Sequence, residues 1–163
     1  MNTLVDRIIA SGLVEGSISA ITYSNRLLGF VSGVFVVAVS TVMYPLFSRY
    51  AAKEDYTDLG STFTQTLTMV MIILLPVTVG TILLREEVVG LVFQRGAFDR
   101  QATSLTAYAL AFYALGLAAF GIRTVLDRVF YALKDTSTPM FNGIIVVGVN
   151  IILNLIFVKY LGV

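Results

Sequence analysis

Four long runs without a charged residue constrain this chain more than any other feature. The runs lie between Arg26 and Arg49, Asp58 and Arg85, Arg100 and Arg123, and Asp135 and Lys159. Each is at least as long as the roughly 20 residues that an α-helix needs to cross the hydrocarbon core of a bilayer. Because helices satisfy their own backbone hydrogen bonds in lipid, the four runs predict membrane-spanning helices.

These runs define an all-α, polytopic transmembrane helical bundle that occupies residues 1–163 as one partial domain. We expect four spans, at about 21–48, 60–84, 101–123 and 138–160, joined by short polar connectors. The apolar piece at 8–14 is too short to span alone, so we interpret residues 1–14 as the end of an incomplete span. The segment 86–93 is interpreted as a short amphipathic helix at the membrane interface. A polar cap at Asp135 and Thr136, followed by Pro139, favours a helix start there.

Composition excludes several classes of function. Hydrophobic residues make up 57% of the chain and charged residues only 13%, with a net charge of +1, so bulk charge gives no reason to expect a nucleic-acid partner. The chain contains no cysteine and no histidine, which removes the thiolate nucleophile, the commonest general base and the usual zinc ligands. We therefore expect that the protein is not an enzyme.

Arg26 is a cation at the start of a long apolar run. At helical spacing it shares a face with Gly29 and Gly33, and a G-x-x-x-G pair lets another backbone approach closely, which predicts helix packing on that face. Two interpretations of Arg26 follow. The guanidinium either lines a wet cavity and binds phosphate or carboxylate, or it lies near the helix end and reaches out to lipid head groups.

Two asparagines lie deep in the last apolar run. Asn150 and Asn154 are one helical turn apart, so their side chains point the same way. With a carboxylate such as Asp6, their oxygens suit a Na⁺ or proton-coupled site. The alternatives are interhelical hydrogen bonds for the asparagines and a capping or interfacial role for Asp6.

Several motifs, in order along the whole chain, resemble one family. They are NRL at 25–27, a second span that ends near Pro45, F-x-RGAFD at 93–99, and FYAL-x-D-x-x-TP at 130–139. Together they are similar to the MurJ (MviN) family of lipid II flippases, within the multidrug, oligosaccharidyl-lipid and polysaccharide exporter superfamily. The chain resembles the seventh to the eleventh span, the beginning of the second of two lobes, and we therefore expect it to be a fragment.

The resemblance implies a role for each candidate residue. Arg26 falls on the family arginine that lines the central cavity and is taken to bind the pyrophosphate of lipid II. Asn25, assigned with it to substrate binding, stands where some members have aspartate, and Gly29 where some have glutamate. Asp6, Asn150 and Asn154 match positions that form a sodium site in some members, although the third position carries aspartate there.

The implied function is translocation of lipid II, the lipid-linked peptidoglycan precursor, across the bacterial cytoplasmic (inner) membrane by alternating access. Apart from Na⁺ as a coupling ion, no cofactor is expected. The expected partners are lipid II, membrane lipids and the remaining lobe of the transporter. Two alternatives stay open: an exporter of another lipid-linked oligosaccharide or drug, and a membrane scaffold that does not transport.

Overall fold

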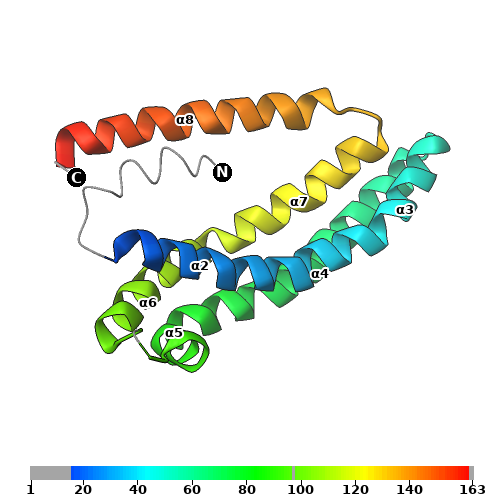
Figure 1. The fold of residues 1–163 in the computed structure, drawn as a ribbon. Helices are drawn as coiled ribbons and strands as arrows, with labels where there is room; N and C mark the ends of the chain where they lie inside the picture. The colour runs from blue at the N-terminus through cyan, green and yellow to red at the C-terminus, as the bar shows by residue number, and fades with distance from the viewer. Residues whose placement is uncertain (1–15, 97, 162–163) are drawn as a thin grey trace.

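The computed structural model describes residues 16–96 and 98–161, and these residues form helices joined by short turns (Figure 1). The prediction of an all-α fold is confirmed, since no strand occurs among the described residues. In chain order the elements are α2 (Ser17–Ser32), the π-helical segment η1 (Gly33–Val37), α3 (Ala38–Ala52), α4 (Tyr56–Leu83), α5 (Arg85–Phe93), α6 (Arg100–Leu115), α7 (Leu117–Ala132) and α8 (Ser137–Leu161).

The first three elements form one continuous helix. It runs from Ser17 to Ala52 over 36 residues, and the predicted span 21–48 lies inside it. At about 1.5 Å per residue it measures about 54 Å, which exceeds the ~30 Å hydrocarbon core of a bilayer. The π-helical turn begins at Gly33 and continues through Val-Phe-Val-Val, residues with weak helix propensity, so a widened turn is least costly there.

The predicted span 101–123 differs from the structure. α6 and α7 meet at Gly116 with a bend of 45°, and the pair continues as helix to Ala132. The N–H of Gly116 donates to the carbonyl of Tyr113, three residues back, which tightens the turn and redirects the axis. Residues 127–132, assigned from the sequence to a connector, therefore complete α7.

The predicted spans 60–84 and 138–160 each correspond to a single helix. α4 is 28 residues long where 60–84 was predicted, and α8 is 25 residues long where 138–160 was predicted. α5 coincides with the segment expected to form a short helix. Its charges are gathered in the first turn and Leu91 is 81% exposed beyond them, so polarity changes along this helix. The predicted incomplete span at 1–14 lies outside the described residues.

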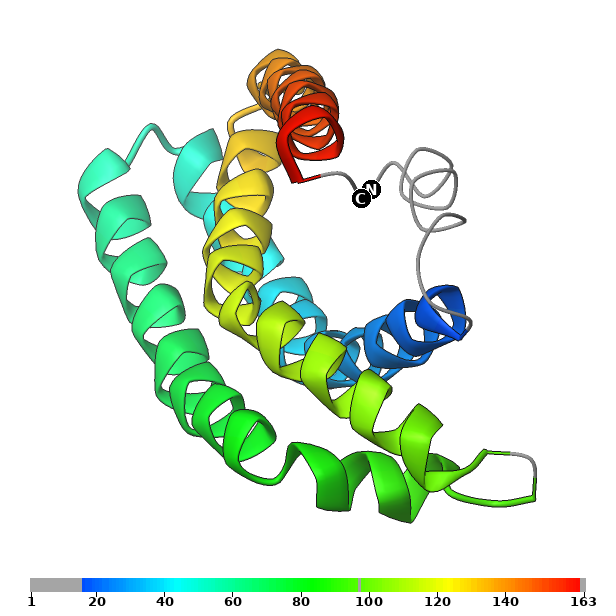
Figure 2. The ribbon, with the colours of Figure 1, turned by 90° about the vertical axis from the view of Figure 1, so that its left-hand side faces the viewer.

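Two pairs of helices pack side by side in the bundle, and a further helix packs on the second pair. α2 packs along α6, and α3 packs along α7, while α4 lies against α3 and α7 on the other side (Figure 2). α7 approaches α4 closely at Gly121, because a Cβ built there would lie 2.5 Å from Leu74 Cδ1 and 3.1 Å from Val70 Cγ1. The buried apolar cluster between these helices includes Leu28, Val36, Phe47, Val70, Leu74, Val89, Leu110, Leu117 and Val125.

α8 leaves this bundle immediately after α7. It stands apart on the side of α7 away from α4 (Figures 1 and 2), and its contacts with the described helices are mainly with α7. Large apolar side chains are exposed on all its sides: Met140, Phe141, Ile144, Ile145, Val146, Val149, Ile152 and Ile156. A helix that is apolar all round requires lipid or other helices around it.

The predicted polar cap of α8 is confirmed. Asp135 Oδ1 accepts from the backbone N–H groups of Ser137 and Thr138, each at 3.0 Å, and Oδ2 accepts from Thr138 Oγ1 at 2.6 Å. Pro139 lies in the first turn, where its missing N–H costs nothing. These hydrogen bonds lower the pKa of Asp135, the one to the Thr138 hydroxyl most of all.

Candidate functional site

Arg26 lies on the side of α2 that does not pack on α6. The packed side carries Ala20, Ser24 and Leu28, one turn apart, and Ser24 Oγ lies 2.9 Å from the carbonyl oxygen of Thr106 on α6. Arg26 follows Ser24 by two residues, about 200° around the helix, and its side chain is exposed. The bundle therefore presents this guanidinium on an outer surface.

Gly29 and Gly33 share this unpacked side with Arg26. No heavy atom of a neighbouring element lies within 4 Å of a Cβ built at either position. The close backbone approach predicted at these glycines is therefore not made within residues 16–96 and 98–161. The reason is that α2 uses its Ser24 side to meet α6, which leaves the glycine side open. Helix packing there remains a prediction for partners outside the described residues.

The guanidinium of Arg26 lies over an aromatic ring. Its Cζ is 5.8 Å from the centroid of Tyr23, one turn toward the helix N-terminus, within the range of a cation–π contact. Among the described residues no carboxylate comes within 4.0 Å of Arg26. Asn25, the second predicted substrate residue, is partly buried beside it. The cation is therefore paired with a ring, and its fork of donors is available to an anion.

Tyr23 also belongs to an aromatic cluster that the sequence reasoning missed. Its ring centroid is 4.7 Å from that of Phe93 at the end of α5, and 5.2 Å from that of Phe98 in the following loop. Phe93 and Phe98 lie 5.9 Å apart. Both phenylalanines belong to the F-x-RGAFD motif at 93–99. The fold brings this motif against α2, about 70 residues earlier in the chain.

A cleft of about 470 Å³ opens beside this cluster. Its charged group is Arg95, which has no carboxylate within 4.0 Å among the described residues. Thr106 lines it and is 1% exposed, and its Oγ1 has no hydrogen-bond partner in the described part of the chain. The remaining lining residues are Gly16, Ser19, Ala20, Tyr23, Phe93, Phe98 and Ala102. The cleft thus combines aromatic walls, hydroxyl groups and one cation.

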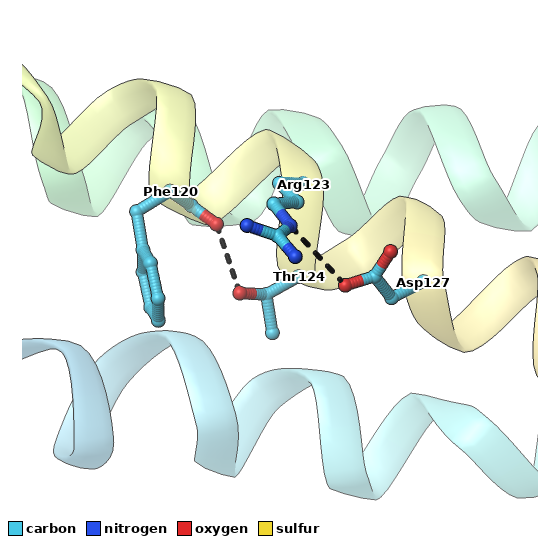
Figure 3. Close-up of polar contacts among 4 residues, drawn as sticks. All are labelled: Phe120, Arg123, Thr124 and Asp127. Atoms are coloured by element: carbon cyan, nitrogen blue, oxygen red, sulfur yellow. Dashed lines mark hydrogen bonds and ion pairs between the residues drawn. The ribbon is translucent and has the colours of Figure 1, made fainter. Parts of the chain in front are cut away.

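Another exposed arginine, Arg123, lies on α7. Figure 3 shows Arg123 Nε facing Asp127 Oδ2, one turn later, at 3.6 Å, while the Thr124 hydroxyl donates to the carbonyl of Phe120. Gly121 and Val125 pack on the opposite side, so this ion pair lies on the side of α7 away from α4. The i, i+4 spacing in the sequence could have identified the pair.

The structure describes only part of the predicted sodium site. Asp6 and the side chain of Asn154 lie outside the described residues, while Asn150 is described and exposed on α8. Elsewhere in residues 16–96 and 98–161, no group of three or more acidic, histidine or cysteine side chains could hold a metal ion. The sodium site remains a prediction.

Comparison with known proteins gives one consistent result. The sequence model of a family described as "Lipid II flippase MurJ" matches residues 1–163. The probable lipid II flippase MurJ of Vibrio cholerae is 35% identical over 162 residues, which cover 99% of this chain and 31% of the relative. The probable lipid II flippase MurJ of Thermotoga maritima is 34% identical over 156 residues, covering 96% of this chain and 32% of the relative.

A solved structure gives the same result at the level of the fold. A lipid II flippase MurJ in an inward closed conformation superposes with a TM-score of 0.85 at 34% identity. The match covers 98% of this chain and 34% of the solved chain. This chain therefore spans about a third of the length of the relatives that it matches.

Proposed function

The chain belongs to the MurJ family of lipid II flippases, and on that premise we propose that it forms part of a transporter that moves lipid II across the bacterial cytoplasmic membrane. Two described helices, Ser17–Ala52 and Tyr56–Leu83, are long and apolar enough to cross a bilayer, and the bent pair α6 and α7 passes the same test together. We further propose a multi-pass protein that works by alternating access and makes or breaks no covalent bond.

The observation that carries this proposal is the setting of Arg26. The side chain is exposed on the unpacked side of a membrane-length helix, and no carboxylate of the described chain neutralises it. A guanidinium fork matches the oxygens of a phosphate group in two parallel hydrogen bonds. In the proposal, Arg26 binds the pyrophosphate of lipid II, and the amide of Asn25 donates a further hydrogen bond.

Charge compensation explains why the arginine is needed. A pyrophosphate that leaves the interfacial water must exchange its hydration for donors of similar strength, or the transfer is strongly unfavourable. Arg26 supplies one cation to this exchange, and the remaining lobe supplies others. In the proposal, the exposed apolar side chains of α8 pack on that lobe and on membrane lipids.

We also propose Na⁺ as the coupling ion, held by Asp6, Asn150 and Asn154. The support is the spacing of the two asparagines, which gives two amide oxygens on one side of α8, and the oxygen chemistry that Na⁺ prefers. Replacement of Na⁺ by K⁺ in a transport assay tests this role. Unchanged transport in K⁺ would remove sodium from the account.

The substrate is tested with the intact transporter that carries this segment, reconstituted in liposomes. Fluorescent lipid II, another undecaprenyl-pyrophosphate-linked oligosaccharide and a labelled phospholipid are offered in parallel. We expect translocation of lipid II, slower translocation of the other oligosaccharide and none of the phospholipid. Equal rates for both lipid-linked saccharides would favour a broader exporter, and no translocation of any lipid would favour a scaffold.

A further inference from the structure

We propose that the cleft between α2, the end of α5 and the start of α6 binds a sugar ring of the translocated lipid. This inference rests on the proposed function and assigns a second subsite beside Arg26. In a lipid-linked saccharide the first sugar is attached directly to the pyrophosphate, so a sugar site must lie next to the pyrophosphate site. Tyr23 meets this condition, because its ring contacts Arg26 and also lines the cleft.

The aromatic walls provide the first part of the recognition. A pyranose ring has a face of C–H bonds, which packs on the electron-rich face of an aromatic ring. The rings of Tyr23, Phe93 and Phe98 are tilted or edge-on to one another, at 38° to 86°. Because they are not stacked, the cluster offers ring faces and edges to a ligand in the cleft.

The polar groups provide the second part. The Oγ1 of Thr106, a residue of the cleft lining, is buried and has no hydrogen-bond partner in the described part of the chain, although buried hydroxyls are normally paired, so a turn of this side chain toward the cleft would complete a pair with a ligand group. Ser19 and Arg95 add a further hydroxyl and a cation to the same lining. Sugar hydroxyl and acetamido groups pair with the hydroxyls, and a carboxylate of the peptide part of the head group pairs with Arg95.

Size and position agree with this ligand. A cleft of about 470 Å³ falls in the range of roughly 300–1,000 Å³ that is usual for small-ligand sites, and suits one sugar ring better than a complete head group. Helical side chains point toward the N-terminus of their helix, and Arg26 accordingly lies over Tyr23. The guanidinium therefore reaches toward the end of α2 where the cleft opens.

The test compares two probes on the intact transporter that contains this segment. Farnesyl-chain lipid II carries the saccharide, whereas farnesyl pyrophosphate carries the same chain and pyrophosphate without it. We expect Phe98→Leu to weaken binding of farnesyl-chain lipid II about tenfold and to leave binding of farnesyl pyrophosphate unchanged. The matched control is Phe112→Leu, the same change at a 75% exposed position of α6 that does not line the cleft.

A second variant shows whether an effect of Phe98→Leu comes from misfolding. Thr106→Val keeps the shape of the side chain and removes only the hydroxyl, so it should also lower affinity for the saccharide probe alone, while Thr106→Ser should retain it. The sugar site would be overturned if Phe98→Leu and Thr106→Val bound both probes more weakly. It would also be overturned if they bound both probes as tightly as the wild type. Arg26→Ala separates the pyrophosphate site from the sugar site, because it should weaken the binding of both probes. If it weakens neither, the pyrophosphate assignment fails, whatever the two cleft variants do.

Discussion

Ser24 and Thr106, which are 82 positions apart in the chain, are joined by a hydrogen bond that fixes α2 against α6. Ser24 Oγ lies 2.9 Å from the carbonyl oxygen of Thr106 and 2.8 Å from that of Ala20 in its own helix. The side chain is fully buried. This contact lies on the side of α2 that faces the bundle, opposite the side that carries Arg26.

Removal of the Ser24 hydroxyl should loosen this contact. We expect Ser24→Ala to lower the free energy of unfolding by about 0.5–1.5 kcal/mol, the usual net contribution of one hydrogen bond. Thr22→Ala is the control, because the Thr22 hydroxyl donates only to Ile18 in its own helix. Thermal unfolding of the intact protein in detergent measures the stability of both variants. Equal effects of the two changes would contradict the role of Ser24 between helices.

Two glycines should respond oppositely to the same substitution. Gly121→Ala places a methyl group against the buried Leu74 and should cost about 1–3 kcal/mol of stability. Gly29→Ala meets open space and should be neutral, or more stable by up to about 1 kcal/mol, because alanine favours the helix. Unfolding in detergent again provides the measurement. A large loss of stability in Gly29→Ala alone would reveal a close neighbour outside the described residues.

The Asp135 cap predicts a pH dependence for the start of α8. The hydrogen bonds from Thr138 and Ser137 lower the pKa of the folded carboxyl below its ordinary value of 3.8. The charged form therefore stabilises the fold fully above pH 3.8, and this contribution disappears as the pH falls through the lower, folded-state pKa. The protection of the first-turn amides of α8 against hydrogen exchange, relative to the intrinsic rate at each pH, should fall in that range. Asp135→Asn should remove this dependence, and a persisting one would point to another group.

The Arg123 and Asp127 pair should contribute little to stability. The Arg123 side chain is 58% exposed and the separation of 3.6 Å is long for a charge-assisted hydrogen bond. A double-mutant cycle of Arg123→Gln and Asp127→Asn should give a coupling of about 0.3–0.5 kcal/mol, the value usual for exposed i, i+4 pairs. A coupling above about 2 kcal/mol would show that this side of α7 is shielded from water.

Charge patterning predicted the all-α fold correctly, because an uncharged run of membrane length has few alternatives in lipid. The bend at Gly116 was not predictable in the same way, since glycine permits a bend without requiring one. The Gly29 and Gly33 pair illustrates a similar limit. Small residues show where a neighbour can approach, whereas the side of α2 that packs on α6 carries Ala20, Ser24 and Leu28.

The candidate site was predictable only in part. Arg26 stands out in the sequence because a cation in an apolar span is costly without a function. The cleft beside it does not stand out, because Tyr23 and the F-x-RGAFD motif become neighbours only when α2 packs on α6. The unpartnered hydroxyl of Thr106 is likewise a property of packing, since the sequence alone shows one threonine among several on α6.

The most direct test of the central claim is the rate of lipid II translocation by the reconstituted intact transporter with Arg26 replaced. We predict that Arg26→Ala abolishes translocation and that Arg26→Lys reduces it substantially, because lysine keeps the charge and loses the bidentate fork. Bulky replacements at Gly29 or Gly33 provide the contrasting variants. Wild-type rates in Arg26→Ala, combined with loss of function at the glycines, would contradict the flippase account and favour a packing scaffold.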